Sequence, residues 1–131
     1  MNNLSKTNLS QIVFLLFFVL TMQAQSSMAH FEIQFHLDKN RIAMDSNQGN
    51  NWNSLYVKSN SFNLNQDGML STEHYKEEYK NSNYIIAISR KGKKIKLEGK
   101  KGVNFKEVAF EIPEKGSYIV INENGIKNDG K

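Results

Sequence analysis

The sequence predicts an all-β domain of about eight antiparallel strands, arranged as two tandem copies of a four-strand motif. Three observations favour this fold class. Apolar and polar residues alternate with a period of two, turn residues separate the alternating runs, and the second half of the chain matches the first. One short helix or loop is expected between the copies. The alternation does not decide between a sandwich and a closed barrel.

Composition limits the size and chemistry of this domain. The chain has 131 residues, no cysteine and a formal net charge of +4 at pH 7. This length suits one domain of ordinary size. Without cysteine the chain has no disulfide, no thiolate metal ligand and no cysteine nucleophile. Fifteen of its 17 basic residues are lysine, so bidentate arginine contacts are scarce.

Residues 1–26 have the composition of a secretory signal peptide. A polar start is followed by nine consecutive apolar residues, 12–20, and then by small polar residues. A bilayer-spanning helix needs about 20 apolar residues, so this run is too short to be one. Three peptide bonds are candidates for cleavage, those after Ala24, Ser26 and Ala29. We therefore expect a secreted or periplasmic domain over 27–131, with no stable membrane span once the leader is removed.

The first copy covers residues 31–70. Its opening strand, 31–37, places apolar side chains on one face and polar side chains on the other. Residues 38–40 are typical of a turn, after which a second strand runs over 41–45. Beyond a polar loop, a further strand pair surrounds the turn at 59–61.

The second copy, 84–126, aligns with the first at an offset of 53 residues. Ile33 then matches Ile86, and Gly49 matches Gly102. A four-residue insertion later raises the offset to 57, after which two Asn-x-x-Gly-apolar segments also coincide. Turn glycines and asparagines do not follow from alternation, because they are chosen for positive φ. Their match therefore favours an internal duplication.

Residues 71–83 connect the copies and break the alternation. Tyr75 and Tyr79 lie four residues apart among good helix formers, which predicts one short helix or an ordered loop. Copies of about 40 residues are too small to bury separate cores. We therefore expect the two copies to share a single domain.

A basic cluster surrounds the first hairpin of the second copy. Its members are Arg90, Lys91, Lys93, Lys94, Lys96, Lys100 and Lys101. The first copy has three cations against four anions, whereas the second has nine against five, so the shared fold does not require this charge. The cluster would attract a polyanion such as a surface polysaccharide or lipid headgroups. No aromatic residue for base stacking lies within 90–101, which disfavours nucleic acid. A solvated hairpin without a ligand is the alternative.

One segment has a calcium-like spacing. Residues 63–70 carry side-chain oxygens at alternate positions and a glycine, as in the start of a calcium-binding loop. The twelfth position is His74 instead of a glutamate, and the matching part of the second copy begins with Ile119 and Ile121. A β-turn explains both copies, so we expect no metal site and no cofactor.

Histidines and aromatic residues favour structural roles. His30 and His36 share a strand face but lie about 20 Å apart, too far to bind one metal ion. Trp52 aligns with Phe105, and a position that is aromatic in both copies favours the core. Tyr56 is expected on the opposite, exposed face.

The most favoured function is a secreted, non-enzymatic β domain that binds a protein or an anionic glycan at its surface. The common motifs of serine hydrolases, zinc proteases and phosphate loops are absent from the sequence. One alternative is a structural subunit that assembles through strand edges. Another is a periplasmic enzyme inhibitor that acts through loop 45–51. A small hydrolase using His36, Asp38 or His74 is the least favoured.

Overall fold

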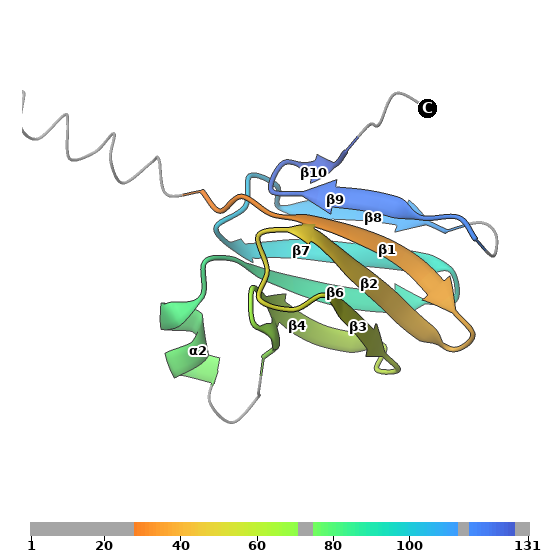
Figure 1. Ribbon diagram of the computed structural model, residues 1–131, viewed down its shortest axis with the longest axis horizontal. Helices are drawn as coiled ribbons and strands as arrows, with labels where there is room; N and C mark the ends of the chain where they lie inside the picture. Colours follow the sequence, from red (N-terminus) through yellow and green to blue (C-terminus); the bar gives the residue numbers. More distant parts are fainter. Residues whose placement is uncertain (1–27, 71–74, 113–115, 128–131) are drawn as a thin grey trace, which may run out of the picture.

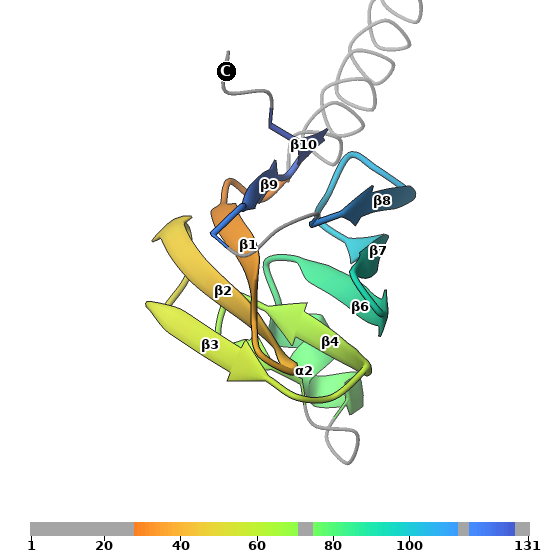
Figure 2. The same ribbon diagram turned by 90° about the vertical axis from the view of Figure 1, so that its right-hand side faces the viewer.

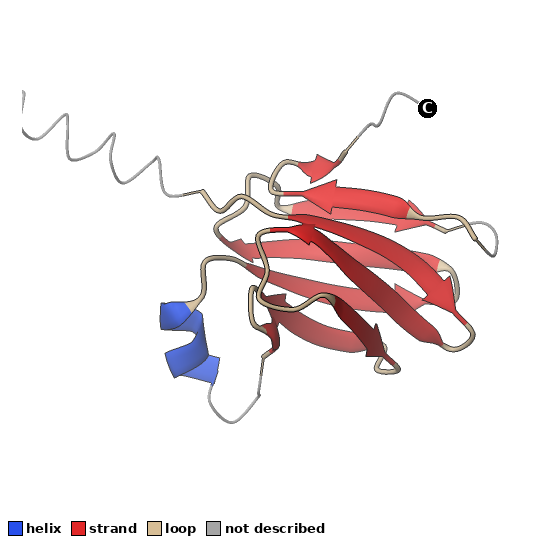
Figure 3. Cartoon of the chain, viewed as in Figure 1, coloured by secondary structure: helices blue, strands red, loops and turns tan. Residues whose placement is uncertain are grey.

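The computed structural model describes residues 28–70, 75–112 and 116–127. The leader predicted over 1–26 lies outside the described residues. Strands dominate the described chain, and one short helix, α2 (Tyr75–Asn81), precedes the second copy (Figure 3). The predicted all-β class is therefore confirmed.

The described strands form two five-stranded antiparallel sheets that face each other as a sandwich (Figures 1 and 2). Sheet A has the order β10-β9-β1-β2-β3 and sheet B the order β5-β4-β6-β7-β8. The strands of sheet A are β1 (Glu32–Asp38), β2 (Arg41–Gln48), β3 (Ser54–Val57), β9 (Ile119–Asn122) and β10 (Gly125–Ile126). Those of sheet B are β4 (Ser61–Asn65), β5 (Gly68–Met69), β6 (Ile85–Lys91), β7 (Lys94–Lys101) and β8 (Glu107–Glu111).

The described residues form two strands more than the expected eight. β5 and β10 have two residues each and follow the two Asn-x-x-Gly turns. In each turn the chain reverses so that Gly68 pairs with Asn65, and Gly125 pairs with Asn122. A two-residue strand is too short to produce alternation, which is why the sequence pattern did not reveal it.

The two copies have the same strands in the same register. β6 begins at residue 85 and β1 at residue 32, which reproduces the offset of 53, and β7 begins at 94 against 41 for β2. The pairing register shifts between Glu32 and Ile33 in the first copy. It shifts between Ile85 and Ile86 in the second, which is the equivalent place. Even the irregularity of the hairpin is therefore repeated.

Each copy completes the sheet of the other. The β4–β5 hairpin of the first copy pairs with β6, and the β9–β10 hairpin of the second copy pairs with β1. The registers agree, since Leu64 lies opposite Ile86 and Ile121 lies opposite Ile33. This exchange of hairpins gives the domain an internal pseudo-twofold axis.

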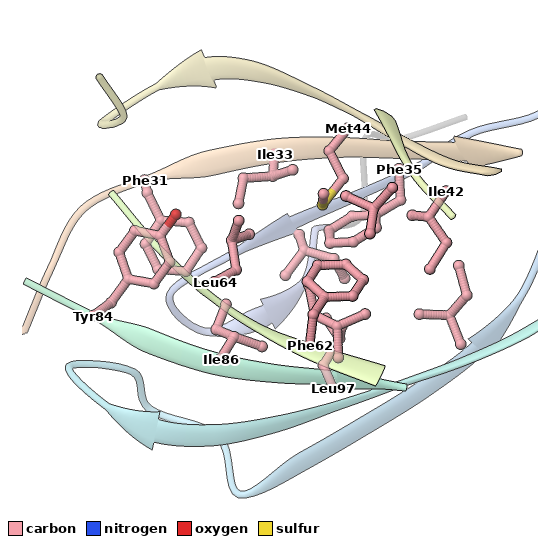
Figure 4. Packing of buried hydrophobic residues seen from close by; sticks show 14 of the residues in the cluster. Phe31, Ile33, Phe35, Ile42, Met44, Phe62, Leu64, Tyr84, Ile86 and Leu97 are labelled. Carbon is pink, nitrogen blue, oxygen red and sulfur yellow. The ribbon is translucent and has the colours of Figure 1, made fainter. Parts of the chain in front are cut away.

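The pseudo-twofold axis passes through the core. Phe31 and Tyr84 occupy equivalent positions, and their rings stack with centroids 4.0 Å apart (Figure 4). Burial raises the pKa of the Tyr84 hydroxyl, with the charge of Asp67 as a smaller cause, and this hydroxyl donates to the Asn65 carbonyl at 3.2 Å. Large side chains from both sheets pack around this pair, and each contributes about 1.5–3 kcal/mol by its burial.

The structure explains two matches between the copies, that of Trp52 with Phe105 and that of Gly49 with Gly102. Trp52 is only 9% exposed and its indole N–H donates to the Asn65 carbonyl at 3.2 Å, so its predicted core position is confirmed. A Cβ on Gly49 would lie 2.2 Å from the His30 carbonyl oxygen. One on Gly102 would lie 2.1 Å from the oxygen of Asn83. These close backbone approaches admit only glycine.

Candidate polyanion-binding site

The turns of both copies meet at one end of the sandwich, at the right in Figure 1. The Arg90 guanidinium donates to the Asn40 carbonyl at 3.0 Å, and the Arg90 backbone N–H donates to the Asn60 carbonyl at 2.8 Å. At the same end, the Ile112 N–H donates to the Lys93 carbonyl at 3.2 Å. Arg90 therefore links the β6–β7 hairpin to two loops of the first copy.

We call this region the basic end and define it as residues 38–41, 58–60, 90–94 and Glu111. Its cations are Lys39, Arg41, Lys58, Arg90, Lys91, Lys93 and Lys94, and its anions are Asp38 and Glu111. Seven cations against two anions give a net charge of +5. The remaining described residues carry seven cations against eight anions, a net charge of −1. The whole positive excess of the described chain therefore lies at the basic end.

Lysines present most of this charge to solvent. The Arg41 guanidinium is 2.5 Å from the Asp38 carboxylate and lies over the Tyr56 ring, 4.7 Å from its centroid. Arg90 donates to two backbone carbonyls, those of Gly92 at 2.7 Å and Asn40 at 3.0 Å. The five lysines of the basic end are all exposed. Exposed ammonium groups on long side chains suit a polyanion better than one ligand of fixed geometry.

The rest of the predicted cluster is not part of the basic end. Lys96 lies on the outer face of sheet B, 2.9 Å from Glu107 and 3.2 Å from Glu98, and Lys100 is 3.1 Å from Glu98. Hydrogen bonds from Lys100 and then Lys96 hold the pKa of Glu98 below its ordinary value. Glu107 and then Glu98 raise the pKa of Lys96. These two lysines are thus partly neutralised by their neighbours.

Lys101 belongs neither to the basic end nor to the pair Lys96 and Lys100. Its ammonium donates to the Tyr79 carbonyl at 2.7 Å and lies 5.2 Å from the centroid of the Tyr79 ring. The seven predicted residues therefore divide into four at the basic end, two on the outer face of sheet B and one against α2. Strand β8 brings Glu107 and Glu111, which are distant from the cluster in sequence, beside it.

Three cations of the basic end were missed by the sequence interpretation: Lys39, Arg41 and Lys58. Their copy is slightly acidic as a whole, so its average charge concealed them. The repeat alignment does match the turn at 38–41 with the turn at 91–94. The two turns come together because the copies exchange hairpins, and local sequence patterns contain no signal for that exchange.

The calcium-like segment forms a turn in both copies. The Asn65 side-chain oxygen accepts the Asp67 N–H at 2.8 Å, and the equivalent bond from Asn124 to Asn122 measures 2.9 Å. Asp67 also accepts a bond from the Asn51 side chain. The predicted β-turn is therefore confirmed.

Other polar groups are spread over the surface. An open cavity of about 420 Å³ separates this turn from α2, and its lining residues are Asn65, Asp67, Glu77, Glu78 and Asn81. His30 lies 3.4 Å from Glu123, and His36 lies 3.7 Å from Asp45. His74 lies outside the described residues. No group of three or more His, Asp or Glu residues in the described chain can hold a metal ion.

Comparisons with known protein families, curated proteins and solved structures find no match for this chain. Within the described ranges, no helix combines the length and apolar character needed to cross a membrane. Among the described residues, the basic end carries the positive charge excess of the surface.

Proposed function

We propose that this chain is a secreted, non-enzymatic β-sandwich that binds an anionic polysaccharide through its basic end. The main support is the link that Arg90 makes between turns of both copies, which gathers exposed lysines from three loops. Clustered positive charge attracts a dense polyanion and raises its rate of association. Protruding turns do not enclose a substrate, which suits binding rather than catalysis.

Paired lysine substitutions test this proposal on the full chain. Variants Lys39→Gln/Lys58→Gln and Lys91→Gln/Lys94→Gln each remove two charges, the first pair from one copy and the second pair from the other. A lysine near an anionic surface contributes about 1 kcal/mol, so each pair should weaken binding to heparin roughly 30-fold at 0.15 M salt. Affinity is measured by titration, with circular dichroism as the check on folding.

Lys96→Gln/Lys100→Gln is the matched control. It removes the same charge from the outer face of sheet B, where both lysines are paired with glutamates. We expect the control to bind heparin within about threefold of the parent, because these lysines lie outside the basic end and salt screens their charge from a ligand bound there. Equal losses in all three variants would show attraction to net charge alone and would reject the basic end as the site.

A further inference from the structure

Two exposed tyrosines stand on one row of the outer face of sheet A. Tyr56 on β3 is 53% exposed, and Tyr118, directly before β9, is 54% exposed. Tyr56 pairs with Ala43, which pairs with His36 on β1. Ile119 pairs with Phe35, so its neighbour Tyr118 falls beside His36. The row across the sheet is therefore Tyr118, His36, Ala43 and Tyr56.

The centre of the row offers little exposed surface between the two tyrosines. Ala43 is fully buried, and Val120 on the adjoining row is only 6% exposed. The two tyrosines are three strand spacings apart, or about 14 Å. Arg41 lies over the Tyr56 ring and also belongs to the basic end, so the row and the basic end adjoin. Two exposed aromatic rings thus stand at the ends of the row, and the basic end lies beside it.

The fold does not require these aromatic residues. The equivalent row of sheet B, in the same register, consists of Ser61, Ser89, Lys96 and Ala109. Ser61 corresponds to Tyr118, and Ala109 corresponds to Tyr56. Since the same strands pair without any aromatic residue there, strand pairing alone does not explain the two exposed rings of sheet A.

We infer that this row stacks sugar rings of the anionic polysaccharide whose charged groups bind the basic end. The inference rests on the proposed function and specifies its ligand as a charged glycan. Pyranose rings pack their C–H faces on aromatic rings, and two rings about 14 Å apart can hold separate sugars of one chain. The nearby exposed cation Lys39 receives carboxylate or sulfate groups, while Arg41 stays beside the Asp38 carboxylate and over one face of the Tyr56 ring.

Charge on the far side of the row favours a glycan over nucleic acid. Asp45 lies on the outer face of sheet A on the side of the row away from the basic end, and Glu32, farther along, is paired with Lys127 at 2.6 Å. The Asp45 carboxylate would repel a phosphate backbone laid along the row, although tyrosines also stack on bases. A polysaccharide can turn its anionic groups toward the basic end and leave its hydroxyls near the carboxylates.

Tyrosine substitutions in the full chain test the inference. Tyr56→Ala and Tyr118→Ala should each weaken binding of a heparin oligosaccharide about fivefold. Tyr56→Phe keeps the ring and should bind as the parent does. The matched control is Tyr79→Ala, which removes an exposed tyrosine of α2 that contacts Lys101. Oligothymidylate of similar length is titrated in parallel, and we expect it to bind more weakly than heparin.

The outcomes separate this inference from the proposed function. If the basic-end lysine variants lose affinity while Tyr56→Ala and Tyr118→Ala bind heparin like the parent, the stacking row is rejected and the basic end remains. A parent protein that fails to bind heparin rejects both. Tighter binding of oligothymidylate, lost in the tyrosine variants, overturns the choice of a glycan.

Discussion

Lys39 has a positive φ, and the equivalent position in the second copy is a glycine, Gly92. Lys39 has φ 57° and Gly92 has φ 62°, each at the first loop position of a two-residue hairpin turn. Hairpin turns of this length require positive φ at that position. A side chain makes that conformation costly, so the first turn contains strain that the second does not.

Lys39→Gly should therefore raise the free energy of unfolding by roughly 0.5–1 kcal/mol, after allowing for the greater freedom of glycine in the unfolded chain. Gly92→Ala should lower it by a similar amount, since a Cβ there meets no atom within 4 Å and only the backbone is strained. Urea denaturation measures both. Lys39→Ala removes the same charge but keeps the strain, so a gain in that variant would contradict the explanation.

At the scale of elements, a side-chain oxygen in each exchanged hairpin adds a hydrogen bond, beyond the strand pairing, to the backbone at or directly before the start of the opposite copy. A Glu123 carboxylate oxygen accepts the Phe31 N–H at 3.1 Å, and the Gln66 side-chain oxygen accepts the Asn83 N–H at 2.8 Å. Burial acts to raise the pKa of Glu123. Its own backbone N–H, that of Phe31 and the His30 ring together hold the pKa below its ordinary value.

Glu123→Gln should make the free energy of unfolding fall less steeply as the pH is lowered. The depressed pKa means that the carboxylate stabilises the fold above about pH 4.5, and that this contribution is lost as the pH falls through the folded-state value. Glutamine keeps the acceptor, as at Gln66, so stability at pH 7 should change by less than about 1 kcal/mol. Urea denaturation between pH 3 and pH 7 gives the slope, and an unchanged slope below pH 4.5 would refute the assignment.

Local sequence patterns predicted the longer strands and the hairpin turns well, because each of these elements depends on residues that are adjacent in the chain. Alternation from Phe31 to Leu37 revealed β1, and turn residues located both long hairpins. The two-residue strands and the exchange of hairpins were not predictable, because they depend on pairing between residues distant in sequence, such as Ile33 with Ile121. The site shows the same division. The cluster around Arg90 is visible in the sequence, whereas its partners Lys39 and Lys58 become neighbours only in the folded domain.

At the scale of the whole molecule, the exchange makes the order of the two copies unimportant for strand pairing. β1 needs β9 and β6 needs β4, whichever copy comes first in the chain. The pseudo-twofold axis relates Leu70 to Lys127 and Asn81 to Met28. Ten residues join Leu70 to Asn81, and most of them belong to the compact helix α2. A linker of about ten residues should therefore also join Lys127 to Met28.

A circular permutant that runs from Tyr75 to Lys127, through a flexible linker, and then from Met28 to Leu70 should fold to the same sandwich. It keeps every strand pair, opens one connection and adds one, so its stability should fall by no more than a few kcal/mol. Circular dichroism, gel filtration and urea denaturation test this expectation. A second permutant, opened between Asn40 and Arg41, separates strands joined by a tight hairpin and should be less stable. If only the second permutant folded cooperatively, chain order would matter more than the exchange of hairpins, and the two copies would not be interchangeable halves.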